Sequence, residues 1–250
     1  SRALDPQLHT HVCVLNVTFD PVEKRWKGVQ PYGFMRHQGF LREVCYNRLA
    51  ARMQEGGYEL ERQSAIGFTI KGFPAELREK FSQRRQRILE IAAEKGRSSQ
   101  DDLQTIALES RAAKRHATAA ELQAGWRASA GAHLATIEAV IEGTRHKLAA
   151  PPVRTAADAL AAADAHLFER KSVVTTRDLL REALVWGRGT VDLTELRTEL
   201  DARVAGGELR RVGDEVASRD GAKAEEEFVA WAAAGRERCG YLGSHPTESN

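Results

Sequence analysis

The segment that most restricts the fold of this chain is the alternating run HTHVCVLNVTF at residues 9–19. A run that is rich in Val and Thr and alternates with period two is typical of a half-buried β-strand. Asp20-Pro21 would end this strand. The run therefore predicts a strand that displays His9 and His11 on the same face.

Helices and further strands follow this first strand. A helix is expected over about residues 38–54, where Gly56-Gly57 stops it. Two short alternating runs, 58–62 and 66–71, predict paired antiparallel strands. Pro74 then fits the first turn of a long helix, where its missing N–H is harmless. This mixture predicts an α+β fold in which an antiparallel sheet has flanking helices.

From residue 99 onward the pattern is helical without strands. A helix or a pair of helices is expected over 101–123, and Pro151-Pro152 marks a linker or boundary. We therefore expect a sheet-containing domain, a helical linker, a mainly helical region with a winged-helix outline, and an acidic tail, over residues 1–98, 99–152, 153–212 and 213–250 respectively.

The helical region contains the outline of a DNA-binding motif. A helix over 176–186 ends at a glycine-flanked turn, and a second helix begins at Asp192, where Glu195 completes a capping box. Residues 208–212 are expected to form a short strand. Helix, tight turn, helix and strand together indicate a helix-turn-helix or winged-helix unit, and an ordinary helical hairpin is the alternative.

Composition excludes several classes of protein. The 250 residues are 42% apolar and 29% charged, which is enough for one large or two small globular domains. Mean hydropathy is −0.45 and no apolar run approaches the roughly 20 residues that cross a bilayer, so a soluble protein without membrane insertion is expected. The three cysteines show no C-x-x-C spacing, which argues against a disulfide framework and favours the cytoplasm.

Charge is distributed unevenly along the chain. Residues 1–97 carry 17 Lys and Arg against 11 Asp and Glu, whereas residues 98–250 carry 20 against 24. The first part is therefore the candidate for binding a polyanion. Within it, Lys80, Arg84 and Arg87 line up along the long helix that follows Pro74. The alternative for this basic stripe is a helix edge that covers the core with its aliphatic stems.

His9 and His11 are the first candidates for chemistry. Two side chains two residues apart on a strand lie about 6.5 to 7 Å apart at Cα, so both imidazoles can converge on one cation. Two ligands do not complete a site, because a catalytic metal usually takes a third protein ligand and an open position. The alternative is a pair of half-buried histidines on a sheet.

The opening S-R-x-x-D-P-x-L-H-T-H-V-x-V-x-N, at residues 1–16, closely resembles the metal-binding signature of conjugative relaxases of the MobF (TrwC/TraI) class, which are HUH-type single-strand DNA endonucleases. The likeness covers residues 1 to about 212 and weakens after about 115. It continues in that family's order through residues 46–50, 57–59, 67–74 and 81–85.

The resemblance implies a specific chemistry. In that family three histidines hold a divalent cation, here expected to be Mg²⁺ or Mn²⁺, on the scissile phosphate of single-stranded DNA at an origin of transfer. A tyrosine attacks the phosphorus and stays joined to the 5′ end. His9 and His11 match two of the three ligands. Other conjugative transfer proteins are further expected partners. The expected DNA contacts are Arg2, Lys71, Lys80, Arg84 and Arg87.

The sequence also departs from the family pattern. The family's remaining histidine lies three residues before Ser1 and its nucleophilic tyrosines lie further upstream. No tyrosine of this chain matches them, so no catalytic residue is assigned and the chain alone is expected to be inactive. The four tyrosines of this chain are Tyr32, Tyr46, Tyr58 and Tyr241.

Two interpretations follow from the resemblance. The first is a fragment of a relaxase, comprising the later part of the nicking domain and the start of the helicase region. The second is a non-catalytic DNA-binding or scaffold module in which His9 and His11 are relics. In either case single-stranded bases could stack on aromatic side chains, for which Trp26 and Tyr32, expected in a loop, are candidates.

Overall fold

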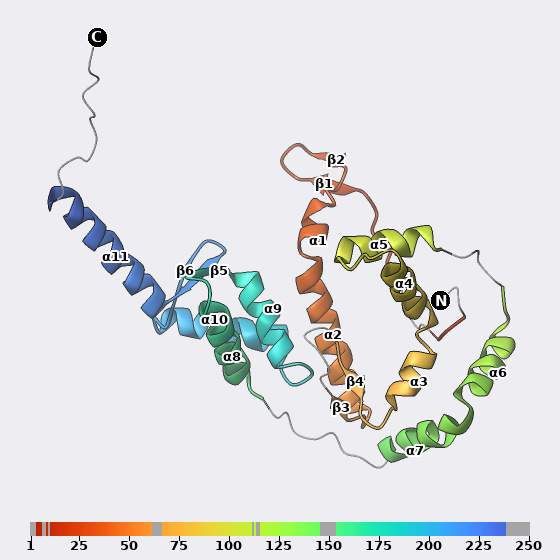
Figure 1. Cartoon of the computed structure of the whole chain (residues 1–250). Coiled ribbons are helices and arrows are strands. Elements are labelled where there is room, and N and C mark those ends of the chain that lie inside the picture. The colour runs from red at the N-terminus through yellow and green to blue at the C-terminus, as the bar shows by residue number, and fades with distance from the viewer. Residues whose placement is uncertain are drawn as a thin grey trace, which may run out of the picture. The chain divides into compact units, whose positions relative to one another are not determined.

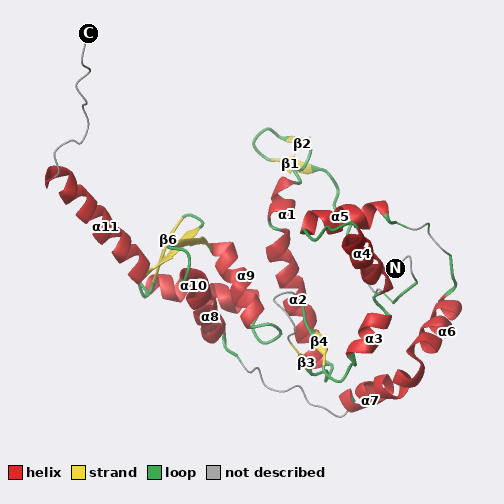
Figure 2. Ribbon diagram, in the orientation of Figure 1, coloured by secondary structure: helices red, strands yellow, loops and turns green. Residues whose placement is uncertain are grey.

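The computed structural model describes residues 4–6, 9, 11–61, 67–111, 113, 116–145 and 154–238. These residues combine helices with short antiparallel strands, which confirms the expected α+β class (Figures 1 and 2). The chain divides into two compact units. The first consists of Ser1–Gln30, Glu55–Ser64 and Phe68–Ala149, and the second of Pro31–Gln54, Ala65–Gly67 and Ala150–Asn250.

Two small hairpins supply the strands of the first unit. β1 (Thr18–Asp20) pairs antiparallel with β2 (Arg25–Lys27). β3 (Leu60–Glu61) pairs antiparallel with β4 (Thr69–Ile70), with Leu60 opposite Ile70. The antiparallel pairing expected for the two alternating runs is therefore confirmed, although the paired stretches are shorter than the runs.

The prediction of a strand over 9–19 is wrong for most of that stretch. In the described residues, pairing with another strand begins only at Thr18. Val12, Val14 and Leu15 are 79%, 66% and 75% exposed. No described segment offers backbone groups to residues 11–17. An extended segment without a neighbouring strand gains no ladder hydrogen bonds and buries no face, whatever its β-propensity.

The helices of the first unit also differ from expectation. The long helix predicted after Pro74 is two helices, α3 (Ala75–Lys80) and α4 (Gln83–Glu94). The helix is interrupted at Ser82. The Ser82 hydroxyl donates to the Arg78 carbonyl at 2.7 Å, and this side-chain bond competes with the backbone hydrogen bonds of a continuous helix. The other helical elements of this unit are α5 (Gln100–Glu109), α6 (Ala119–Ala130), the 3₁₀ turn η1 (Gly131–His133) and α7 (Leu134–Thr144).

The second unit contains the winged-helix outline. Its order is α8 (Ala156–Phe168), β5 (Val173–Thr175), α9 (Thr176–Trp186), α10 (Leu193–Ala205), β6 (Leu209–Val212) and β7 (Glu215–Ser218). The strands form an antiparallel sheet in the order β5-β7-β6. A helix, a strand, two helices and a two-stranded wing favour the winged-helix interpretation over a simple helical hairpin.

Local signals fixed the two central helices as expected. Asp192 caps α10 by accepting from the backbone N–H groups of Thr194 and Glu195 at 2.6 and 2.9 Å. Glu195 completes the capping box by accepting from the Asp192 N–H at 2.8 Å. The core beneath consists of fully buried apolar side chains. They include Leu160, Leu179, Leu184, Leu196, Leu200 and Val216.

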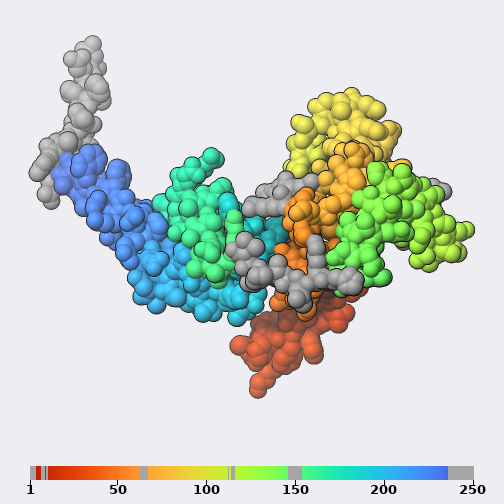
Figure 3. Space-filling model, turned by 90° about the horizontal axis from the view of Figure 1, so that it is seen from below, coloured from red at the N-terminus to blue at the C-terminus, as the bar shows by residue number. Residues whose placement is uncertain are grey.

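The acidic stretch after residue 212 is not simply a tail. β7 lies between β5 and β6 and buries Val216, and α11 (Arg219–Arg238) follows it directly. α11 extends away from the α8–α10 body of its unit (Figures 1 and 3). The stretch folds despite its acidic residues, because the alternation from Glu215 to Ser218 supplies the buried Val216, and β5 and β6 on either side supply hydrogen-bonding partners.

Two further helices precede these elements in the second unit. α1 (Tyr32–Arg36) leads into α2 (Gln38–Glu55), which matches the helix expected over 38–54. Phe40 and Val44 of α2 pack against the core formed by α8, α9 and α10. In the part of the chain that the structure describes, no helix is both long and apolar enough to cross a membrane.

Candidate functional site

His9 and His11 are brought together by the structure. Their Nε2 atoms lie 3.2 Å apart, and the ring centroids lie 4.8 Å apart with the rings at 67°. Both residues are exposed. The convergence expected from their spacing of two is therefore present, even though the segment that carries them is not paired into a sheet.

The separation of the two nitrogens suits a shared cation. Two imidazole nitrogens that each lie about 2.0 to 2.1 Å from one ion are roughly 2.9 Å apart at a right angle and roughly 3.3 Å apart at a tetrahedral angle. The observed 3.2 Å falls between these values. The same distance is also compatible with an N–H···N hydrogen bond between a donor and an acceptor ring. The donor set and its exposure thus fit a divalent ion.

A third ligand is not among the residues that the structure describes. No group of three or more His, Cys, Asp or Glu side chains converges there in a way that could hold a metal ion. Within those residues, His9 and His11 form a two-nitrogen donor set, and the rest of a coordination sphere would have to come from elsewhere.

The chain just before the two histidines is anchored to α6. The indole Nε1 of Trp126 donates to the Leu4 carbonyl oxygen at 2.6 Å. Asp5 is only 6% exposed. Asp5 belongs to the opening motif that carries the resemblance. A half-buried indole hydrogen bond and a buried carboxyl hold the residues ahead of the histidine pair in place, which limits where that pair can move.

Lys71 follows β4 directly and is already engaged. Its Nζ lies 2.9 Å from Glu59 Oε2, and its backbone N–H donates to the Glu59 carbonyl at 2.8 Å. The neighbouring Glu59 carboxylate raises the pKa of the Lys71 ammonium. Both side chains border a cavity of about 360 Å³ next to α7. Lys71 remains 60% exposed, so a phosphate could compete with Glu59 at little cost.

The basic stripe is not one helix face. Lys80 ends α3, whereas Arg84 and Arg87 lie on α4 beyond the break at Ser82. Lys80 is exposed, and Arg87 is exposed and pairs with Glu90 at 3.1 Å. Because the helix is interrupted, the spacing of these three residues no longer guarantees that they share one line.

Arg84 binds the end of a neighbouring helix. Its guanidinium donates to the Ser110 carbonyl at 2.7 Å and to the Ala107 carbonyl, both at the end of α5. The last carbonyls of a helix lack the N–H groups of a following turn, and the Arg84 guanidinium supplies donors to two carbonyls at this end. Arg84 is half-buried and ties α4 to α5. The remaining expected DNA contact, Arg2, lies outside the described residues.

One feature escaped the sequence analysis. Trp26, which was expected in a loop, lies on β2 opposite Phe19 of β1. The signal that could have found it is the pair of short β-prone stretches, VTF and RWK, on either side of a Pro-containing turn.

A family model described as TrwC relaxase matches residues 1–133. The multifunctional conjugation protein TraI of Escherichia coli is 34% identical to this chain over 137 residues, which are 50% of this chain and 7% of that protein.

Solved structures of the conjugative relaxase TrwC are also similar. The metal-free complex with oriT DNA is 30% identical, with a TM-score of 0.49 over 52% of this chain and 46% of that chain. The metal-bound complex with oriT DNA is 30% identical, with a TM-score of 0.48 over 52% and 46%. A complex of TrwC with a 27-mer that comprises the recognition hairpin and the cleavage site is 30% identical, with a TM-score of 0.49 over 52% and 48%. The chain spans less than half the length of each of these relatives.

Proposed function

We infer the function from one premise, that this chain belongs to the TrwC relaxase family, whose model matches residues 1–133. We propose that the chain is part of a conjugative DNA relaxase, an enzyme that nicks one strand at an origin of transfer and joins itself to the cut end by transesterification. TraI, a conjugation protein, is a relative over half of the chain, which supports this assignment.

The observation that carries the metal-dependent part of this proposal is the 3.2 Å separation of His9 Nε2 and His11 Nε2. These two nitrogens would hold a divalent cation, Mg²⁺ or Mn²⁺, together with a third histidine from outside these 250 residues. When bound, the cation would neutralise charge on the phosphoryl oxygens of the DNA. The two imidazoles would orient it and keep it on the exposed side of the segment.

The basic side chains of the first unit would position the DNA. Lys71, Lys80 and Arg87 are exposed and would contact phosphates, as would Arg2. Such contacts are salt-sensitive and carry little sequence information. Arg84 would contribute indirectly, by holding α4 against α5. No residue of this chain is assigned as the nucleophile, and the chain alone would not cleave.

The metal claim is tested by titrating the chain with Mn²⁺. His9→Ala and His11→Ala should each lower the affinity, because each removes one of two converging nitrogens. His166→Ala, which changes an exposed histidine of α8, is the matched control and should leave the affinity unchanged. Equal affinities for all four proteins would contradict the metal assignment.

The nicking claim is tested on a supercoiled plasmid that carries an origin of transfer, with Mn²⁺ or Mg²⁺. The chain alone should not nick it. The chain joined to the upstream segment that supplies a tyrosine and a third histidine should nick it, and His11→Ala in that longer protein should abolish nicking.

A second candidate function rests on the second unit. The α8-β5-α9-α10-β6-β7 order is that of a winged helix, which favours a non-catalytic DNA-binding or scaffold module. The exposed face of α10 carries Glu195 and Asp201 beside Arg197, so this helix is a poor match for a phosphate backbone and fits a protein partner better. Absence of cleavage by both proteins would favour this candidate. Metal-independent DNA binding would then identify a DNA-binding module, and no DNA binding would identify a scaffold for a protein partner.

A further inference from the structure

Two tryptophans of the described chain stand exposed, each against a phenylalanine. Trp26 of β2 is 69% exposed and meets Phe19 of β1, 47% exposed, with ring centroids 5.4 Å apart at 69°. Trp231 of α11 is 72% exposed and meets Phe228, 64% exposed, with centroids 5.9 Å apart at 31°. Large exposed aromatic surface of this kind indicates a binding site.

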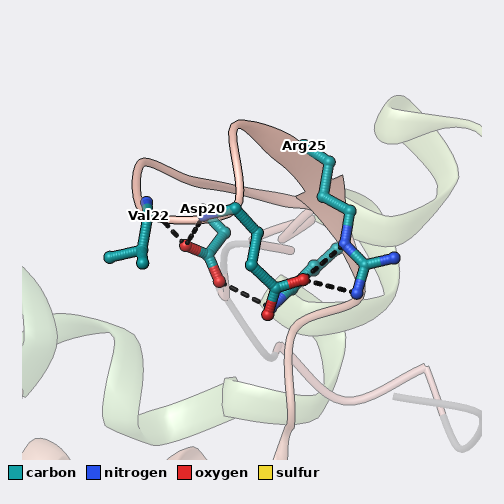
Figure 4. Close-up of polar contacts among 5 residues, drawn as sticks. Asp20, Val22 and Arg25 are labelled. Atoms are coloured by element: carbon teal, nitrogen blue, oxygen red, sulfur yellow. Dashed lines mark hydrogen bonds and ion pairs between the residues drawn. The ribbon is translucent and has the colours of Figure 1, made fainter.

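The first pair belongs to a hairpin whose two faces differ. Phe19 and Trp26 are directly opposite in the register, so their rings share one face. The other face carries an ionic network, in which Lys27 Nζ bridges Asp20 Oδ2 at 2.6 Å and Glu23, and Glu23 also pairs with Arg25 (Figure 4).

The turn between the strands is fixed as well. Asp20 Oδ1 accepts from the backbone N–H groups of Val22 and Glu23 at 2.9 and 3.1 Å (Figure 4). Lys24 takes a positive φ of 52° and is exposed at the tip. A two-stranded hairpin alone is marginally stable, and these bonds hold its aromatic face in one geometry. The face is therefore organised before any ligand arrives.

Charge separates the two aromatic pairs. Residues 24–27 read Lys-Arg-Trp-Lys, so cations neighbour Trp26 in the sequence. Arg25 and Lys27 are paired with Glu23 and Asp20 on the opposite face of the hairpin, whereas Lys24 is exposed at its tip. Residues 225–228 read Glu-Glu-Glu-Phe, so three carboxylates precede the second pair. A polyanion is attracted to the first site and repelled from the second. Proteins that bind single strands combine exposed aromatic rings with cations in this way.

We propose that Phe19 and Trp26 form a stacking platform for bases of single-stranded DNA, with Lys24 at the hairpin tip beside the phosphates. The proposal deepens the proposed function, because it names a base-contacting surface of the same protein apart from the histidine pair. A base plane stacks on the exposed indole, and Phe19 supports the indole edge-on from the neighbouring strand.

The test measures fluorescence anisotropy of labelled oligonucleotides with the full chain, in EDTA and low salt. One oligonucleotide is a thymidine tract, and the other has the same length and phosphates but abasic sites. The chain should prefer the thymidine tract. Trp26→Ala should weaken binding to this tract by on the order of ten- to a hundredfold and leave binding to the abasic tract unchanged, as expected for loss of one stacked base.

Two further variants sharpen the test. Trp26→Phe keeps a ring and should retain part of the preference, which separates stacking from loss of the hairpin fold. Trp231→Ala removes an equally exposed tryptophan beside carboxylates and should change neither affinity. The stacking proposal is overturned if the chain does not distinguish the two tracts, or if Trp26→Ala weakens both equally. It is also overturned if Trp26→Ala weakens neither, an outcome that would assign the face to a protein partner.

A negative result in this experiment is distinguishable from a negative result in the test of the proposed function. The anisotropy measurement contains no free divalent metal, so it does not depend on His9 or His11. If those histidines prove irrelevant to metal while Trp26 still discriminates the tracts, the metal-dependent relaxase assignment falls and the stacking platform stands.

Discussion

At the scale of single residues, a buried ion pair joins α2 to the turn between α9 and α10. Glu43 of α2 and Arg188 of the α9–α10 turn are bonded to each other, with side chains only 3% and 7% exposed. Asn47, one turn further along α2, accepts from the Gly189 N–H and donates to the Val191 carbonyl, each at 2.6 Å. These bonds attach α2 to the turn between α9 and α10.

Removing the Glu43 carboxylate should lower the free energy of unfolding substantially. Glu43→Ala leaves the Arg188 guanidinium in the interior without this counter-charge, and breaking a buried pair in this way typically costs about 3 to 5 kcal/mol. We expect a loss of this size in the free energy of unfolding from urea denaturation. Glu226→Ala, which removes a partner of Arg210 from a pair that is 64% and 70% exposed, should cost about 1 kcal/mol or less. Similar losses for both would contradict the structural role.

Asp164 of α8 predicts a pH dependence. Burial raises the pKa of its carboxyl, with Glu208 adding to the rise and Arg203 opposing it. Because the folded-state pKa is raised, stability from the protonated form is present below the ordinary value of about 3.9 and is lost as the pH rises through the folded-state pKa. Asp164→Asn should therefore raise Tm at pH 7 and have almost no effect at pH 3. A lower Tm at pH 7 would contradict this reasoning.

At the scale of elements, the sequence predicted helices that depend on local caps better than it predicted strands that depend on distant partners. The caps that begin α9 and α10 are bonds between residues two or three apart, so a short stretch of sequence contains both partners. The strand over 11–17 needed a neighbour that residues 9–19 do not contain. The helix after Pro74 broke at Ser82, where a side-chain bond competed with a helical pattern that otherwise continued.

The cap of α10 gives a prediction at this scale. Asp192→Ala leaves the N–H groups of Thr194 and Glu195 without their acceptor, and loss of such a cap typically costs about 1 kcal/mol. Thermal unfolding followed by circular dichroism should show the loss. Asp201→Ala, which changes an exposed aspartate in the same helix that pairs with Arg211, is the control and should cost less. A control loss equal to that of Asp192→Ala would refute the capping role.

At the scale of the whole molecule, each compact unit is built from segments that are not consecutive in the sequence. α2 lies within the stretch that the relaxase family model matches, yet it packs in the second unit. Ala50 of α2 is fully buried, and a Cβ on Gly189, at φ +77°, would lie 3.1 Å from it. Only a glycine lets the turn adopt this backbone and approach α2 so closely.

This arrangement predicts how the molecule opens. Residues of one cooperative unit exchange their amide hydrogens together. Leu184→Ala, in the core of the second unit, should speed exchange in α2 along with α8, α9 and α10, and leave α4 and α5 unaffected. Ile106→Ala, equally buried in the first unit, should do the reverse. Hydrogen-exchange mass spectrometry of the full chain measures both, and an α2 that follows α4 and α5 would contradict this division.

The sequence by itself determined what depends on near neighbours. It identified the convergence of His9 and His11 and the capped starts of α9 and α10, because i, i+2 and i, i+3 relations fix them locally. It also predicted the antiparallel pairing of Leu60 with Ile70, because both lie in short alternating runs that are close in the sequence. Membership of the relaxase family also follows from ordered motifs that need no coordinates.

Only the tertiary structure decided which surfaces meet. It assigned Arg84 to the end of α5, placed Glu43 and Asn47 against the α9–α10 turn, and set Trp26 opposite Phe19. Each of these depends on a partner whose position follows from packing of whole elements, since the desolvation of a charge or the burial of a ring is a property of the surroundings and not of the residue type.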